Sequence, residues 1–384
     1  MWRHIASNAL TFLILGLFLL SGLLLWGRGA YVTQGPLDQA ICLNVPRGAT
    51  MHLVSERLEE QGAIRAGWMF RAGADYTGKA QALKAGSYLV PEGASMARIT
   101  DIVTRGGAST CGTEIVYRIG ITQASAQLRE LDPQSGRYEI RASFTLGEGT
   151  PPASYEQIKQ AAGTRFRVAL AEGVTSWQVL KELGQIDILT GETALPPEGS
   201  LAPDSYEIRP GETIGALVAR MQSAQSAILE TAWAGRTSDL PLSSAEEALI
   251  LASIVEKETG NAQERFDVAS VFVNRLNKGM RLQTDPTVIY GITRGQGVLG
   301  RGLRRSELDR ETPWNTYVIK GLPPTPIANP GRAAIEAVLN PSQTDHIYFV
   351  AKTLDPADGH NFASTLDAHN RNVAAYRALE AARE

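Results

Sequence analysis

One long apolar segment at the N-terminus constrains this chain more than any other feature. Residues 5–26 are mostly apolar, with Leu and Phe dominating, and carry no charge. As a helix, a run of about 22 residues crosses the roughly 30 Å hydrocarbon core of a bilayer. A cleaved signal peptide has a shorter apolar core and a small-x-small cleavage site, for which Gly29-Ala30 is a poor match. The sequence therefore predicts a retained transmembrane anchor within residues 1–28.

Composition places the rest of the chain among ordinary globular proteins. The 384 residues suffice for two or three domains, and 43% of them are hydrophobic while 20% are charged. The formal net charge is −3, and no basic stripe interrupts that balance. Both observations argue against a nucleic-acid partner.

The histidines and cysteines form no metal-binding pattern. His346, His360 and His369 are scattered, and no His-Glu-x-x-His motif is present. We expect neither a metal nor another cofactor. The two cysteines, Cys42 and Cys111, flank the first small module described below. They form a disulfide if they lie close together in an exported protein, or they are two separate buried thiols.

A short unit of strand, glycine turn and helix recurs between the anchor and residue 225. Each copy has a Gly-containing turn followed by Thr or Ser as the N-cap of a helical pattern. The turns are at 45–50, 90–95, 171–175 and 209–213, and the helices extend to about Glu60, Val103, Leu183 and Met221. Strand patterns at 86–89 and 204–208 precede two of these turns. The units predict small strand–helix modules at 40–107 and 166–225.

Residues 108–165, between the two modules, have a different pattern. Positions 138–144 alternate in the manner of a strand, and a loop rich in Gly and Pro follows at 147–152. We predict a β-rich element here. Contact with a partner and simple packing are both open as its role.

The segment 249–290 contains two glutamates at the end of an apolar helix. Ser243 and Ser244 are each followed three residues later by a glutamate, which is the capping-box pattern, and Gly260 suits a left-handed C-terminal cap. Leu251, Ile254, Val255 and Glu258 share one helical face, whereas Glu256 lies about 200° round the helix, beside Ala252 and Ser253. The stripe predicts Glu258 as a buried acid with a raised pKa and Glu256 as a flanking residue. The alternative is that both glutamates are solvated residues in a last helical turn.

This segment resembles the endolytic murein (peptidoglycan) transglycosylases, which cut the glycan strands of nascent peptidoglycan. The matching positions are 252–259, 268–276, 279–291, 311–313, 315–317, 321–324, 326–327, 329–331 and 369–370. The resemblance is strong over about 240–376 and covers the anchor and the small modules in outline. It implies that Glu258, the second glutamate of Glu-Lys-Glu, is the catalytic residue.

The resemblance also implies a domain organisation. A membrane-anchored α+β chain is expected, with LysM-like modules at 40–107 and 166–225 and a mixed α/β catalytic domain at 226–384. The modules would contact glycan, or they are spacers that hold the site away from the membrane. The 108–165 element departs from the family pattern, in which this junction is shorter, and is interpreted as an insertion.

Polar and aromatic residues near Glu258 in the matching segments are the candidates for substrate binding. Amide, hydroxyl and carboxylate groups can recognise hexosamines, and tyrosine rings can pack on sugar faces. The candidates are Gln283, Thr284, Asp285, Tyr290, Asn315, Thr316, Tyr317, His369 and Asn370. Loop capping or core packing is the alternative for each. Asp285 is either a second catalytic carboxylate or a residue that shapes the loop before Pro286.

The expected reaction is endolytic cleavage of the MurNAc–GlcNAc β-1,4 bond to give 1,6-anhydro-MurNAc ends, which limits glycan strand length. Two alternatives remain: a non-catalytic peptidoglycan-binding scaffold, and a hydrolytic muramidase that uses Glu258 with Asp285 and water. Arg3 and Arg28 specify orientation poorly, but the short N-terminal tail and the resemblance favour a cytoplasmic tip. We therefore expect a single-pass protein of the bacterial inner membrane with a periplasmic catalytic domain, acting on glycan strands beside peptidoglycan synthases.

Overall fold

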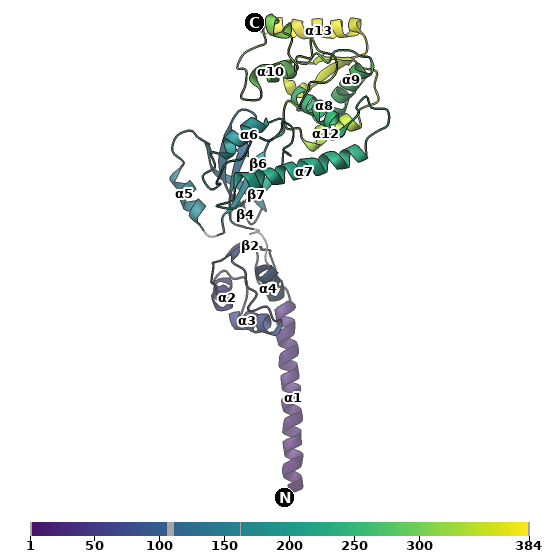
Figure 1. Ribbon diagram of the computed structural model, residues 1–384. Helices are drawn as coiled ribbons and strands as arrows, with labels where there is room; N and C mark the ends of the chain where they lie inside the picture. Colours follow the sequence, from purple (N-terminus) through teal and green to yellow (C-terminus); the bar gives the residue numbers. More distant parts are fainter. Residues whose placement is uncertain (1, 106–110, 162, 383–384) are drawn as a thin grey trace. The chain divides into compact units, whose positions relative to one another are not determined.

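The computed structural model describes residues 2–105, 111–161 and 163–382 and has the mixed α/β composition expected (Figure 1). The chain divides into two compact units. Unit 1 comprises Met1–Val116, Gln127–Phe144 and Gly149–Phe166, and unit 2 comprises Tyr117–Ala126, Thr145–Glu148 and Arg167–Glu384.

Unit 1 begins with the long helix α1, Trp2–Val32. Among the described residues, Ile14–Val32 is the helical stretch long and apolar enough to cross a membrane. Its large side chains up to Trp26 are exposed, whereas Tyr31 is buried in the core of the following module. The last turn of α1 is therefore part of a folded module and not of an isolated span.

The module after α1 is a two-stranded sheet packed on three helices. Strand β1, Ile41–Val45, pairs antiparallel with β2, Gly86–Val90, so that Ile41 lies opposite Val90. The helices are α2, Met51–Glu60, α3, Gly67–Tyr76, and α4, Met96–Arg105. Leucine, valine and phenylalanine side chains from all five elements form one apolar core, because each helix buries a single stripe against the sheet.

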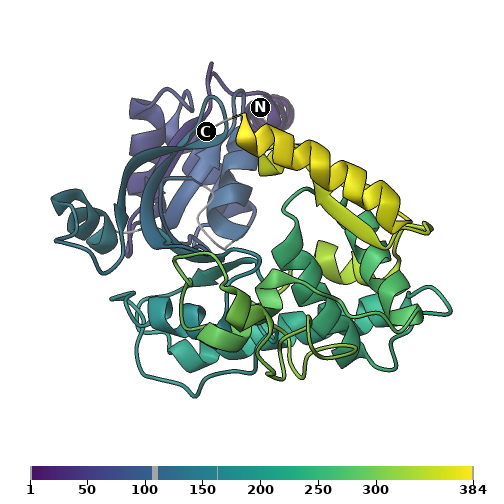
Figure 2. The same ribbon diagram turned by 90° about the horizontal axis from the view of Figure 1, so that it is seen from above.

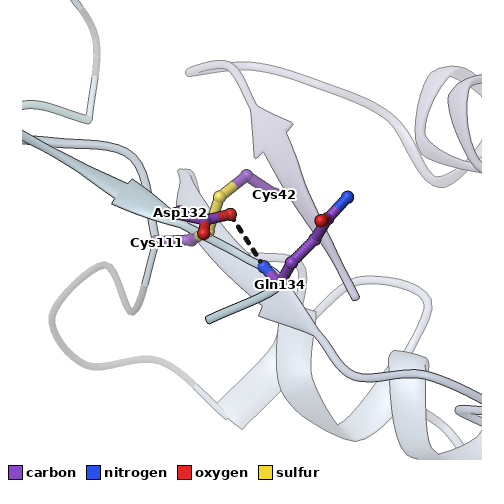
Figure 3. Close-up of a disulfide and its surroundings, with 4 residues drawn as sticks. All are labelled: Cys42, Cys111, Asp132 and Gln134. Atoms are coloured by element: carbon purple, nitrogen blue, oxygen red, sulfur yellow. Dashed lines mark hydrogen bonds between the residues drawn. A yellow bond between two sulfur atoms is a disulfide. The ribbon is translucent and has the colours of Figure 1, made fainter. Parts of the chain in front are cut away.

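Cys42 of β1 and Cys111 are joined by a disulfide (Figure 3). Their Cα atoms lie 5.6 Å apart, within the usual range for a disulfide. The Cys111 N–H donates to the Ser87 carbonyl at 3.2 Å, which holds this segment beside β2. Nearby, the Gln134 N–H donates to Asp132 Oδ1 at 3.0 Å.

All four predicted glycine turns are present, each followed by a helix. Gly48, Gly93, Gly173 and Gly211 have φ of 76°, 62°, 76° and 85°, a region that L residues with a Cβ rarely adopt. Side-chain oxygens of Thr50, Ser95, Thr175 and Thr213 accept from the third residue of the helix that follows. The third helix, α6, spans Ser176–Leu183, and the fourth, α7, spans Ile214–Ala234. Helix α7 thus extends well beyond the end predicted near Met221.

A five-stranded sheet has the order β5-β4-β3-β6-β7. Its strands are β3, Thr113–Ile119, β4, Ala124–Asp132, β5, Arg137–Thr145, β6, Arg165–Leu170, and β7, Ser205–Ile208. A short helix, α5, Ala153–Gln160, follows β5. The strand predicted at 138–144 is confirmed as the middle of β5. The predicted limit between residues 107 and 108 lies outside the described residues, and the limit at 165 coincides with the first residue of β6, so the predicted domain boundaries stay predictions.

Helices dominate the rest of unit 2. They are α8, Ala245–Glu258, α9, Arg265–Asn277, α10, Asp285–Thr293, α11, Arg305–Leu308, α12, Arg332–Leu339, and α13, Leu366–Ala381. A hairpin of β8, Tyr348–Ala351, and β9, His360–Ala363, with the 3-10 turn η1, Pro356–Asp358, between its strands, lies beside α13. Helices α8, α9 and α12 gather around one apolar core. Figure 2 shows the ribbon from above, with this part of the chain in green to yellow.

The start of α8 was predicted correctly and its end was not. Ser244 is the N-cap and accepts from the Glu247 N–H at 3.3 Å, while Glu247 reaches back to the Ser243 N–H at 2.6 Å. The left-handed cap at Gly260 is wrong. Thr259 ends the helix in an extended conformation, with φ −142° and ψ 131°, because its hydroxyl is held by Glu264 at 2.7 Å.

Candidate active site

The last turn of helix α8 carries two carboxylates, Glu256 and Glu258, at the edge of the protein core. Ala252 and Ser253 are as fully buried as Leu251 and Ile254, so α8 is surrounded by protein and has no solvent face at this point. Burial raises the pKa of both Glu256 and Glu258. Glu256, predicted to flank the apolar stripe, is thus half-buried like Glu258, because the side of α8 that carries Ala252 and Ser253 is covered as well.

Glu258 experiences opposing influences on its protonation. Burial is the largest and raises its pKa. The Thr284 hydroxyl donates to Glu258 Oε1 and favours the carboxylate, as do the nearby His360 and Arg275, whereas the negative charge of Asp285 opposes ionisation. Burial prevails, so Glu258 keeps its proton at a higher pH than an ordinary glutamate. This is the condition for a general acid.

Thr284 is fixed by a buried hydroxyl network. Its N–H donates to Thr316 Oγ1 at 3.1 Å, and its carbonyl accepts from Thr287 Oγ1 at 2.7 Å. The Thr287 and Thr316 hydroxyls are 2.8 Å apart. Thr284, Thr287 and Thr316 are all buried. Thr284 thus contacts the candidate catalytic group, while Thr316 positions Thr284.

Gln283 and Asp285, on either side of Thr284, are exposed. Gln283 has φ 52°, a left-handed conformation that is uncommon for a residue with a Cβ. Its N–H donates to the Thr316 carbonyl at 3.1 Å, which stabilises this backbone conformation. Asp285 Oδ1 accepts from the Tyr317 hydroxyl at 2.7 Å. Burial, followed by the contact with Asp285, raises the pKa of Tyr317. Asp285 and Tyr317 therefore lie near Glu258, since Asp285 raises the pKa of Glu258 and Glu258 raises that of Tyr317.

Two of the predicted substrate-binding residues have mainly structural contacts. Asn315 is fully buried, and its amide donates to the Glu307, Leu308 and Arg310 carbonyls at 3.2, 2.9 and 2.6 Å. The Tyr290 hydroxyl donates to Glu198 Oε2 at 3.2 Å, and no described contact joins it to Glu258. These contacts match the alternative of loop capping and packing.

His369 and Asn370, at the start of α13, differ in their surroundings. The His369 ring stacks on Tyr348 with centroids 4.9 Å apart, and burial together with the charge of Arg275 lowers its pKa. Tyr348 has the Arg275 guanidinium on it at 5.5 Å. Arg275 also lowers the pKa of Glu258, so this stack lies near the carboxyl. Asn370 is exposed.

Sequence reasoning missed three residues around the site: Arg275, Glu264 and His360. Arg275 is buried, and its Nε and Nη1 donate to the Ile347 and Leu282 carbonyls at 2.7 and 2.5 Å. Glu264 accepts from the His360 N–H at 2.7 Å and contacts His360 Nδ1 at the same distance. The position of Arg275 in the matched segment 268–276 was the one available signal. The contacts Arg275–Ile347 and Glu264–His360 join residues far apart in the sequence, which no local pattern reports.

A second buried polar cluster connects α8 to neighbouring segments of unit 2. Glu256 Oε2 accepts from the Gly331 N–H at the start of α12 at 3.0 Å. Lys257 Nζ donates to the Gly173 carbonyl at 3.3 Å, and burial lowers its pKa. Glu198 accepts from the Ser176 N–H at 2.8 Å, and burial raises its pKa. The Glu-Lys-Glu triplet therefore holds the turn before α6 and the start of α12 against α8. Within the described ranges, no group of three or more His, Cys, Asp or Glu could hold a metal ion.

Comparison with known proteins identifies the class to which this fold and site belong. The model of the YceG-like family matches residues 43–132 and 113–375. Since this is most of the chain, the protein belongs to the YceG-like family.

Two relatives and one solved structure are similar to this chain over most of its length. A Bacillus subtilis (strain 168) protein named endolytic murein transglycosylase is 28% identical over 334 residues, which are 86% of this chain and 82% of the relative. A protein of the same name from Streptococcus pneumoniae serotype 2 is 26% identical over 399 residues, with 97% of this chain and 65% of the relative covered. A crystal structure of a yceG-like protein from Listeria monocytogenes has a TM-score of 0.46 and 22% identity, covering 87% of this chain and 98% of that chain.

Proposed function

We propose that this protein is an endolytic lytic transglycosylase that cleaves the MurNAc–GlcNAc β-1,4 bond of nascent peptidoglycan strands. Family membership and the names of two relatives support the class of activity. The observation that carries the proposal is the buried Glu258 carboxyl, whose pKa is raised and which the Thr284 hydroxyl holds in place. It lies beside the exposed Gln283 and Asp285, where a glycan can approach.

The proposed chemistry needs one carboxyl group. Glu258 donates its proton to the glycosidic oxygen as the bond from that oxygen to C1 of MurNAc breaks. The C6 hydroxyl of the same MurNAc attacks C1, and its proton passes to the Glu258 carboxylate. A C1–O6 bond replaces the C1–O4 bond, and Glu258 ends protonated. Because nucleophile and C1 belong to one sugar, proximity lowers part of the barrier.

Roles for the surrounding residues follow from their placement. Thr284 orients the Glu258 carboxyl and stabilises it when it is ionised. Gln283, Asp285 and Tyr317 face solvent and are proposed to bind the sugar, with His369 and Asn370 at the margin of the site. Thr316, Asn315 and Tyr290 support these residues from the buried side, through the contacts given above.

A hydrolytic muramidase is the alternative enzyme, with Asp285 as the second carboxylate. Asp285 is exposed and accepts the Tyr317 hydroxyl at 2.7 Å. That contact favours a role in shaping the site. The Thr284 hydroxyl donates to the Glu258 carboxyl. A non-catalytic scaffold would not need a buried carboxyl held in this way.

We also propose the cellular setting. Helix α1 would anchor the protein in the bacterial inner membrane with residues 40–384 in the periplasm, and the Cys42–Cys111 disulfide suits an oxidising compartment. The modules at 40–107 and 166–225 would be LysM-like, either contacting glycan or acting as spacers, and residues 108–165 would be an insertion. Residues 226–384 would form the catalytic domain. Peptidoglycan synthases are the proposed partners, since an anchored enzyme meets strands as they leave the membrane.

Product analysis tests this proposal. The purified protein is incubated with glycan strands from sacculi, and the products are measured by mass spectrometry. We expect internal cleavage with 1,6-anhydro-MurNAc ends. Reducing ends would assign the muramidase reaction instead, and binding without cleavage would assign the scaffold.

A further inference from the structure

Helix α3 of unit 1 has an exposed aromatic stripe. Trp68 is 60% exposed and Tyr76 is 90% exposed, and Ala72 between them is also exposed. Their spacing of four residues places all three on one face of the helix. The other side of α3 is in the core of the module through Met69 and Phe70. The most solvent-exposed large aromatic side chains of this module thus lie in one line.

Helix α3 is attached to the last turn of α1. The Gly73 backbone lies against the Tyr31 ring so closely that a Cβ at Gly73 would be 2.2 Å from Tyr31 Cε2. Tyr31 is buried, and its hydroxyl donates to Thr100 Oγ1 of α4 at 2.8 Å. Both helices hold the end of α1, so the height of α3 along the α1 axis is fixed.

That height corresponds to the edge of a bilayer. From Ile14 to Trp26 the side chains of α1 are exposed, and Ala30 and Tyr31 pack into the module core. Tyr31 is five residues beyond Trp26, which is about 7–8 Å along a helix. The polar layer on each side of the hydrocarbon core is roughly 5–8 Å thick. Figure 1 shows α3 on the side of the module from which α1 leaves.

The chemistry of the stripe fits the same layer. Tryptophan and tyrosine concentrate at membrane–water interfaces, because an apolar ring carries a polar N–H or O–H. Asp75 is exposed next to the stripe, and Arg65 is exposed just before the helix. Charges at these positions suit lipid headgroups and exclude deep insertion.

We propose that α3 lies on the periplasmic surface of the bilayer, with Trp68 and Tyr76 among the lipid headgroups. The inference rests on the proposed membrane anchor. It gives unit 1 a second attachment to the membrane, so that the module is held at one inclination and does not pivot about α1.

Depth-dependent fluorescence quenching tests the proposal on the full chain. The protein is reconstituted in vesicles of phosphatidylcholine and phosphatidylglycerol, with or without bromine at a shallow position of the acyl chains. The emission of one tryptophan is obtained as wild type minus its Phe variant. The variants are Trp68→Phe, Trp26→Phe for the anchor, and Trp314→Phe, whose ring is packed between Tyr290 and Arg294, for the background.

We expect the Trp68 emission to fall at least about two-fold in brominated vesicles, because interfacial rings contact the upper acyl chain. Trp26 should be quenched and Trp314 unaffected. Tyr76→Trp in the Trp68→Phe background should give a second quenched reporter.

Three outcomes would contradict these expectations. If Trp26 is quenched while neither Trp68 nor the tryptophan introduced at position 76 is quenched, the inference is overturned and the anchor stands. Blue-shifted but unquenched emission from the stripe would indicate a second copy of the chain on this face and would also overturn the inference. If Trp26 is unquenched as well, the anchor itself is refuted.

Discussion

At the scale of single residues, Glu258 combines burial with one hydroxyl donor. Burial favours the neutral acid, and the Thr284 donor favours the carboxylate that forms after proton transfer. A group with both properties can give up a proton and regain it in one reaction. The proposed reaction requires this sequence of events, because no second carboxylate takes part.

Replacing Glu258 by glutamine removes the proton and keeps the shape of the side chain. We expect Glu258→Gln to lower the rate of glycan cleavage by about 10²–10⁴-fold, the usual contribution of a positioned acid or base. The far-UV circular dichroism spectrum should not change. Anhydro products formed at the wild-type rate would remove Glu258 from the mechanism.

The difference in stability between this variant and the wild type should depend on pH. An ordinary glutamate has a pKa of 4.5, and burial raises that of Glu258. The stabilisation from the neutral acid is complete below the unfolded pKa and is lost as the pH rises through the folded pKa. Glutamine stays neutral throughout. Urea unfolding should therefore show equal stability for Glu258→Gln and wild type at acidic pH, and a more stable variant at pH 7–8, whereas a constant difference would contradict the burial argument.

The Thr284 hydroxyl sets the pH range of the reaction. Thr284→Val keeps the shape and removes the donor that lowers the pKa of Glu258. The acid should stay protonated to a higher pH, so the alkaline limb of the kcat/KM profile should shift to higher pH. Thr293→Val is the matched control, since the described contact of the Thr293 hydroxyl is with the Gly295 N–H and not with Glu258. An unchanged alkaline limb in the Thr284 variant would show that another group controls it.

Glu256 is expected to support structure and not the reaction. We expect Glu256→Gln to keep substantial activity, because an amide oxygen can still accept the Gly331 N–H. Glu256→Ala leaves the N–H of a helix start without this partner, which should lower the free energy of unfolding by about 1–3 kcal/mol. Chemical denaturation of the Ala and Gln variants measures the difference. Loss of activity in a stably folded Gln variant would assign Glu256 a catalytic role.

At the scale of elements, the sequence predicted those features that depend only on neighbouring residues. Thr50, Thr175 and Thr213 cap helices at the predicted positions, because an N-cap depends on neighbouring residues alone. The end of α8 depends on Glu264 and His360, and the orientation of Glu256 depends on Gly331 of α12, 75 residues away. A helical stripe cannot report such partners. The stripe therefore indicated the burial that raises the pKa of Glu258 but not the burial that does the same for Glu256.

The disulfide is the strongest link within unit 1 that can be tested at this scale. It closes a loop of 69 residues between β1 and the segment beside β2. The double variant Cys42→Ser, Cys111→Ser should lower the free energy of unfolding by about 2–4 kcal/mol, because the open chain has more unfolded conformations. Reduced wild type should show the same change. Cleavage of purified glycan should persist, since the residues proposed to act on it are all in unit 2. Equal stability with and without the disulfide would contradict this expectation.

At the scale of the whole molecule, the proposed anchor and the first module share a helix. The apolar pattern at 5–26 led to the prediction of a membrane segment, but it did not show that α1 continues to Val32 and ends in the module core. Ala30 and Tyr31, which lie beyond the predicted span, contact the module core through their side chains. The proposed anchor is thus continuous with the first module, so a truncation that removes the anchor has to end before Ala30.

Two truncations separate the roles of α1. Removing residues 1–28 should give a soluble protein that cleaves purified glycan at the wild-type rate, because the groups proposed for the reaction lie in unit 2. Removing residues 1–36 also deletes Tyr31, whose loss from the core should destabilise the module by about 3–5 kcal/mol. Thermal unfolding compares the two. In cells, the shorter truncation exported by a cleavable signal should lose most of its effect on glycan strand length, measured by chromatography of isolated strands, since it is no longer held where new strands emerge. Full cellular function of the soluble form would show that α1 serves export alone.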